Sequence, residues 1–82
     1  LPAYTLQDVL DALPEEVKYK RNDYLIEMWK RDNEWTIGYL FFSADDTLDV
    51  LHLYDETNKS FIDAAYEMLC WCIENGYINQ RN

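Results

Sequence analysis

The stretch that decides the fold is Glu34–Phe42, which reads EWTIGYLFF. It is rich in aromatic and β-branched residues, which favour strands, and successive side chains of a strand point to opposite faces of the sheet. One face is expected to carry Trp35, Ile37, Tyr39 and Phe41, and the opposite face Thr36, Gly38, Leu40 and Phe42. The stretch therefore predicts a β-strand with large apolar side chains on both of its faces.

Further strands are predicted on both sides of this segment. Val17–Lys20 alternates in polarity, and Tyr24–Trp29 is rich in strand formers. Leu48–Tyr54 follows a short polar turn at Ser43–Asp46. Because such short turns join antiparallel neighbours, we expect a meander of three strands, or of four if Val17–Lys20 pairs. On the last strand, one face is assigned Leu48, Val50, His52 and Tyr54, and the other Asp49, Leu51 and Leu53.

A short helix is predicted before the strands. Thr5 and Asp8 have the spacing of a capping box, and Pro14 stops the helix. An apolar stripe follows the helical repeat at Leu6, Val9, Leu10 and Leu13. A helix of about two turns is not stable alone, so it must pack on another element.

A longer helix is predicted after the strands. Asp55–Lys59 is assigned to a polar connection, and Ser60 with Asp63 repeats the capping signature. Gly76 suits the left-handed position that ends a helix near Asn75. The chain is therefore expected to be a single α+β domain over residues 1–82, in the order α-β-β-β-α. It would consist of a three- or four-stranded antiparallel meander, a short N-terminal helix and a long C-terminal helix.

Composition and charge exclude several classes of protein. The chain has 82 residues, of which 49% are hydrophobic and 28% charged, so it is not a disordered or low-complexity chain. Sixteen acidic residues against seven basic ones give a net charge of −9, which opposes direct binding of nucleic acid. The apolar runs are far shorter than a membrane span, and we expect no signal peptide.

The negative charge is concentrated in the second half of the chain. One hypothesis is that these acids form a solvated surface that keeps the protein soluble. The other is that they form an acidic face for a basic partner. The acidic candidates are Asp45, Asp46, Asp49, Asp55, Glu56, Asp63, Glu67 and Glu74.

The sequence predicts no metal ion and no cofactor. On a helix, Cys70 and Cys72 would point about 200° apart, so they neither bridge each other nor share a metal, and zinc-type spacing is absent. Asp45-Asp46-x-x-Asp49 lacks the ligand order and the glycine of a calcium loop. We expect Cys72 to be buried and Cys70 exposed, in a reducing cytoplasm.

No catalytic residue is predicted. His52 is the single histidine and is interpreted as a structural or surface residue. A small enzyme that pairs His52 with Asp55 or Glu56 remains a third hypothesis for the function. The chain has no serine in a nucleophile-elbow context and no glycine-rich phosphate loop.

The aromatic content of 16%, with three Trp and seven Tyr, needs a physical explanation. The two predicted helices cannot readily cover both faces of the sheet. Either the aromatic side chains pack on one another, or one face is an interface with a partner or a second copy. The interface candidates are Leu25, Trp29, Leu40, Phe42, Leu51, Leu53 and Trp71.

Three resemblances bear on the function. The α-β-β-β-α order resembles the double-stranded-RNA-binding domain in topology, but the opposite charge means that its function does not transfer. The order and acidity are also similar to those of small phage inhibitors that present carboxylates in place of DNA phosphates. Leu13-Pro14, the hairpins with Trp29 and Trp35, and Cys72–Gly76 loosely resemble short uncharacterised proteins encoded by bacterial phages and prophages.

We therefore expect a non-enzymatic, cytoplasmic interaction or regulatory module. Its partner would be another protein or a second copy of the chain, with no membrane, nucleic acid or small-molecule substrate involved. The alternative is an acidic mimic that blocks a DNA- or RNA-binding protein.

Overall fold

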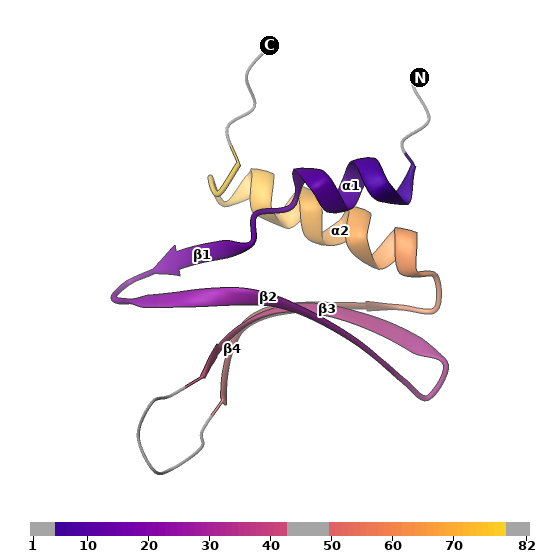
Figure 1. Ribbon diagram of the computed structural model, residues 1–82, viewed down its shortest axis with the longest axis horizontal. Coiled ribbons are helices and arrows are strands. Elements are labelled where there is room, and N and C mark those ends of the chain that lie inside the picture. Colours follow the sequence, from indigo (N-terminus) through magenta and orange to yellow (C-terminus); the bar gives the residue numbers. More distant parts are fainter. Residues whose placement is uncertain (1–4, 43–49, 79–82) are drawn as a thin grey trace.

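The computed structural model describes residues 5–42 and 50–78. Four antiparallel strands form one sheet in the order β1-β2-β3-β4, and both helices lie on the same side of it (Figure 1). The α+β prediction is confirmed, with the optional fourth strand present. The elements are α1 (Leu6–Ala12), β1 (Glu16–Tyr19), β2 (Asn22–Arg31), β3 (Glu34–Phe42), β4 (Val50–Asn58) and α2 (Phe61–Glu74).

Local sequence signals fix the ends of both helices. The Thr5 hydroxyl accepts a hydrogen bond from the Asp8 backbone N–H at 3.1 Å, and the Asp8 carboxylate accepts one from the Thr5 N–H at 3.1 Å, which completes a capping box. Ser60 caps α2 by accepting from the Asp63 N–H. After α2, Gly76 has a φ of +79°, and the Tyr77 N–H donates to the Cys72 carbonyl at 2.8 Å. That pair of features ends the helix with a Schellman turn.

The core lies between the two helices and the sheet side that faces them, called here the inner face. Ile37 and Tyr39 of β3 are fully buried there. Val9 of α1 and Met68 of α2 pack into the same cluster. The Tyr39 hydroxyl donates to the Pro14 carbonyl at 2.8 Å, which links the central strand to the segment between α1 and β1. The hydrophobic stripes of α1 and α2 therefore cover one face of the sheet, and neither helix covers the opposite, outer face.

Strand β4 differs from the prediction in its extent. The expectation that Asp55–Asn58 belongs to a connection is wrong, because β4 runs on to Asn58. These residues pair with the first half of the long β3, from Trp35 opposite Asn58 to Gly38 opposite Asp55. The Thr36 and Thr57 hydroxyls are 2.9 Å apart across this pair. Cross-strand pairing thus holds polar residues in the sheet despite their weak strand propensity.

The predicted faces of β4 are wrong for Tyr54, which the sequence assigns to the same face as Val50 and His52. A register shift between Tyr39 and Leu40 of β3 marks a bulge, which changes the alternation along the paired strand. Residues opposite each other in a sheet share a face. Val50 and His52 pair with Phe42 and Leu40 and lie on the outer face, whereas Tyr54 pairs with Tyr39 and lies on the inner face, as does Leu51 opposite Phe41. Leu48 and Asp49 lie outside the described residues.

Candidate binding surface on the outer sheet face

The end of the outer face formed by β2, β3 and β4 carries an exposed apolar patch. Leu25 pairs with Leu40, Phe42 pairs with Val50, and Leu40 and Phe42 are adjacent on the same face of β3, so the four side chains form a row across the sheet. Leu25 is 44% exposed, Phe42 51% and Val50 41%, and Leu40 is buried at 7%. We call Leu25, Leu40, Phe42 and Val50 the outer patch. Both helices lie on the other side of the sheet (Figure 1), so neither covers it.

Acidic side chains outnumber basic ones on the same face. Alternation and cross-strand pairing place Glu16, Asp23, Glu27, Glu34 and Asp55 on it, together with the bases Lys18 and Arg31. Lys18 lies 3.8 Å from Asp23, so part of its charge is already compensated. Among the described residues, the outer face therefore carries net negative charge.

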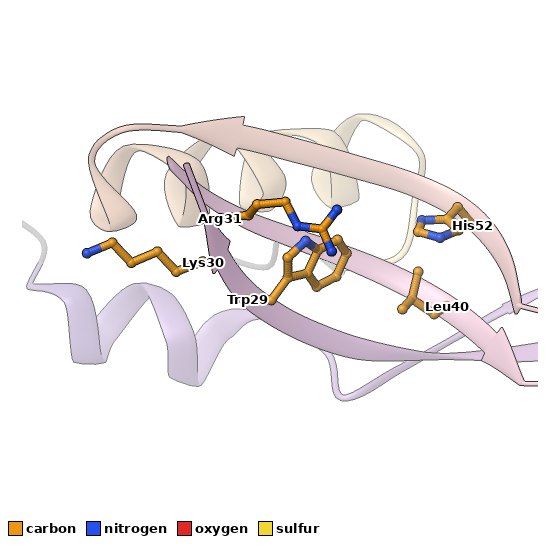
Figure 2. Close-up of a pocket in the computed structure, with 5 residues that line it drawn as sticks. All are labelled: Trp29, Lys30, Arg31, Leu40 and His52. Atoms are coloured by element: carbon orange, nitrogen blue, oxygen red, sulfur yellow. The ribbon is translucent and has the colours of Figure 1, made fainter. Parts of the chain in front are cut away.

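A shallow hollow of about 440 Å³ adjoins the outer patch. Its lining residues are Trp29, Lys30, Arg31, Leu40 and His52, and we call it the Trp29 hollow. Figure 2 shows the Trp29 and Arg31 side chains from β2 on one side, Leu40 and His52 across from them, and the Lys30 ammonium directed away. The Lys30 ammonium instead lies over the Trp35 ring, 5.6 Å from its centroid. The side chains that a ligand in the hollow would contact are therefore those of Trp29, Arg31, Leu40 and His52.

His52 is held beside this hollow by Asp55 and Gly38. Its Nδ1 lies 2.8 Å from Oδ2 of Asp55, and the ring meets Trp29 edge-on with centroids 6.2 Å apart. A Cβ at position 38 would lie 2.1 Å from Oδ1 of Asp55 and 3.4 Å from Cη2 of Trp29. Only a glycine lets the carboxylate and the indole approach the β3 backbone so closely.

The hydrogen bond to Asp55 defines the chemistry that His52 offers. Asp55 Oδ2 accepts from Nδ1–H, so Nε2 of the neutral ring is an acceptor, and none of the described side chains donates to it. The third hypothesis pairs His52 with Asp55 or Glu56; Asp55 is the partner, because Glu56 accepts a hydrogen bond from the Tyr54 hydroxyl instead. Nucleophilic catalysis would also need a nucleophile next to the base. The described residues that line the hollow include no Ser, Thr or Cys.

The predicted interface residues divide into two groups. Four of them, Leu25, Trp29, Leu40 and Phe42, lie together on the outer face. Leu51 lies on the inner face and is 47% exposed, while Leu53 packs against the core. Sequence reasoning missed Arg31 and the role of Gly38. A lone glycine inside a strand pattern is the signal that points to a close approach.

Trp71 is part of the core and not of the outer face. Its ring stacks on Tyr54, with centroids 4.5 Å apart and planes 2° from parallel. Tyr39 and Tyr77 lie 6.2 Å and 5.3 Å from the same ring. Much of the aromatic content is thus used in packing α2 onto β3 and β4.

The predicted acidic residues do not share one surface. Asp63, Glu67 and Glu74 are exposed on α2, on the opposite side of the molecule from Asp55. Glu56 lies on the inner face, where its hydrogen bond is the main cause that raises the pKa of Tyr54 to about 12. Asp45, Asp46 and Asp49 lie outside the described residues.

The cysteines agree with the prediction only in part. Both thiols are free. Cys72 is fully buried and donates to the Tyr39 hydroxyl at 3.6 Å, and burial raises the pKa of its thiol. Cys70 is half-buried, so the expectation that it is exposed is wrong. Residues 5–42 and 50–78 contain no cluster of three His, Cys, Asp or Glu side chains able to hold a metal.

Comparison with family models, curated proteins and solved structures found no match to the chain. Neither helix within the described ranges is long and apolar enough to cross a membrane. The function is therefore inferred from the outer face itself.

Proposed function

We propose that the protein is a protein-binding module that docks its partner on the outer sheet face. The observation that supports this most strongly is the outer patch, where Leu25, Phe42 and Val50 are exposed at one end of a face that neither α1 nor α2 covers. Contiguous exposed apolar side chains within a polar rim are typical of interaction sites. The Trp29 hollow continues the same surface and adds an indole, a residue type enriched among the energetically important positions of interfaces.

The charge of this face indicates the chemistry of the partner. Among its described residues the outer face carries more acidic than basic side chains, and the whole chain carries a net charge of −9. Two copies that met through this face would bring like charges together, which costs free energy. A partner with apolar side chains flanked by Lys or Arg is complementary in both respects, so we infer a basic protein partner in preference to a second copy.

The arrangement of the acids gives less support to nucleic-acid mimicry. A mimic needs carboxylates on one surface at spacings like those of phosphates. Among the described candidates, Asp63, Glu67 and Glu74 lie on α2, Asp55 lies on the outer face, and Glu56 is bound to Tyr54. A cytoplasmic setting belongs to the proposal because the two cysteines are free thiols.

Selection from a random peptide library tests this function without requiring that the partner be identified. Peptides are selected on the wild-type protein, and their dissociation constants are then measured by calorimetry against two variants. Phe42→Asp places a charge in the outer patch. Tyr66→Asp is the matched control, because Tyr66 is 48% exposed on α2.

The proposal predicts peptides that combine aromatic or aliphatic residues with Lys or Arg. Phe42→Asp should weaken their binding at least about tenfold, which corresponds to about 1.4 kcal/mol, and Tyr66→Asp should leave it unchanged. Added salt should weaken binding, since the charge pairs at the rim are screened. A library without binders, or binders sensitive to Tyr66→Asp and not to Phe42→Asp, would refute the proposal.

A further inference from the structure

We propose that the Trp29 hollow receives a tyrosine side chain of the partner, with its ring against Trp29 and Leu40 and its hydroxyl donating to Nε2 of His52. This inference rests on the proposed function and specifies which residue anchors the partner. Three properties of the hollow support it. The hollow has an apolar surface, His52 offers Nε2 as a hydrogen-bond acceptor, and the neighbouring Asp55 carboxylate is already hydrogen-bonded to His52.

The apolar surface favours an aromatic ring. The indole of Trp29 lies close to the backbone at Gly38, where a Cβ would be 3.4 Å from Cη2. Leu40 borders the same space. Aromatic pairs prefer offset or edge-on contacts, which contribute about 0.5–1.5 kcal/mol beyond the buried area. A volume of about 440 Å³ leaves room for one such ring.

The oriented acceptor favours a ring that carries a donor. Asp55 Oδ2 lies 2.8 Å from Nδ1 of His52, and the carboxylate itself is seated over Gly38. In the neutral ring this geometry keeps the proton on Nδ1, so that Nε2 keeps its lone pair, and no residue within 5–42 and 50–78 donates to it. A phenylalanine ring would cover Nε2 without pairing it, and a buried acceptor without a partner costs free energy. A tyrosine hydroxyl satisfies it.

The same geometry disfavours a cationic anchor. Asp55 Oδ2 already accepts from His52, and Oδ1 is buried, so a cation in the hollow would have to compete with His52 for this carboxylate. Arg31 already brings one positive charge to the rim of the hollow. Arg31 would repel a lysine or arginine inserted there, and the acidic residues further out on the face remain available to the partner's basic residues.

NMR titration with two probes tests this anchor directly. The probes are N-acetyl-L-tyrosinamide and N-acetyl-L-phenylalaninamide, which differ by one hydroxyl. His52 is the only histidine of the chain, so its ring signals are unambiguous. The tyrosine probe should shift them saturably, and the phenylalanine probe should bind about three- to tenfold more weakly, as expected for one lost hydrogen bond.

Variants separate the contributions of the ring and of the hydroxyl. Trp29→Ala should abolish binding of both probes, and the control Tyr66→Ala should change neither. In His52→Phe, followed through the Trp29 indole N–H, the two probes should bind equally. Equal binding of both probes to the wild-type protein, or no shift of the His52 signals up to the solubility limit, would overturn the proposal.

The two proposals fail separately. Library peptides that depend on Phe42 but contain no tyrosine would leave the docking function intact and remove the tyrosine anchor. Saturable binding of the tyrosine probe, together with a peptide selection that yields no binders, would remove the docking function. The hollow would then be a site for small aromatic ligands.

Discussion

The carboxylate of Asp55 lies directly against the α-carbon of Gly38 on the neighbouring strand, so that even a methyl group at position 38 would collide with it. Gly38→Ala should therefore displace Asp55 and break its hydrogen bond to His52. We expect the unfolding free energy to fall by about 1 kcal/mol, the usual net value of one hydrogen bond. We also expect His52 to change from mostly Nδ1-protonated to a mixture of tautomers, which ¹⁵N chemical shifts of the ring report.

Gly76→Ala is the matched control for this substitution. A Cβ there meets nothing within 4 Å, although its positive φ makes the variant strained. That variant should lose some stability and leave the His52 tautomer unchanged. An unchanged tautomer in Gly38→Ala would show that Gly38 does not position the Asp55–His52 pair.

Tyr39 makes the free energy of unfolding depend on pH in the alkaline range. Burial raises its pKa far above the ordinary value of 10.0, and the hydrogen bond with Cys72 raises it further. The folded state therefore holds the phenolic proton more tightly than the unfolded state. This contribution is fully present below pH 10 and is lost as pH rises above it, by at most about 1.4 kcal/mol per pH unit. Urea unfolding between about pH 8 and pH 11 should show the decline.

Tyr39→Phe isolates this contribution. At neutral pH it should cost about 1–2 kcal/mol, because the Pro14 carbonyl loses its donor. Above pH 10 its unfolding free energy should decline less steeply than that of the wild type. Some slope should persist because the pKa values of Tyr54 and Tyr77 are also raised. Parallel curves for the two proteins would argue against this role of Tyr39.

Among the aromatic residues, Trp71 should contribute most to the packing of α2 against the sheet. Its ring lies between side chains from β3, β4 and the segment after α2. Trp71→Ala should cost roughly 3 kcal/mol, the lower end of the range for truncating a core aromatic residue, and Trp71→Phe should cost less. Thermal and urea unfolding measure both. Tyr66→Ala, at an exposed position of the same helix, should stay within about 0.5 kcal/mol of the wild type.

The two cysteines should differ in reactivity. Cys72 is fully buried and its thiol pKa is raised by burial, whereas Cys70 is half-buried. Because the thiolate is the reactive form, iodoacetamide should modify Cys70 first in the native protein. Mass spectrometry of timed digests gives the two rates, and in urea they should converge. Faster native modification of Cys72 would contradict its placement in the core.

Local patterns in the sequence are sufficient to predict the elements and their order. The spacing of Thr5 with Asp8 and of Ser60 with Asp63 marks helix starts, and both caps are formed. The residue pattern of Glu34–Phe42 predicts the central strand. That pattern can be read from residues that are adjacent in the sequence. These features need no long-range information.

The errors arise where distant residues decide the structure. The bulge that places Tyr54 on the opposite face from Val50 and His52 depends on how β4 meets β3, and no residue within β4 indicates it. Asp55–Asn58 has little strand propensity and becomes a strand because β3 is long enough to pair with it. Likewise, the sequence does not reveal that Trp71 belongs to the core, because its stacking partners come from three separate segments of the chain.

Docking on the outer face is tested most directly by a map of backbone amide chemical-shift changes. The wild-type protein is titrated with the tightest peptide selected from the random library. We predict that the largest changes fall on the outer patch and the Trp29 hollow, at Leu25, Leu40, Phe42, Val50 and Trp29. Changes concentrated on the exposed side of α2, at Asp63, Tyr66 and Glu74, with the outer face unaffected, would contradict it.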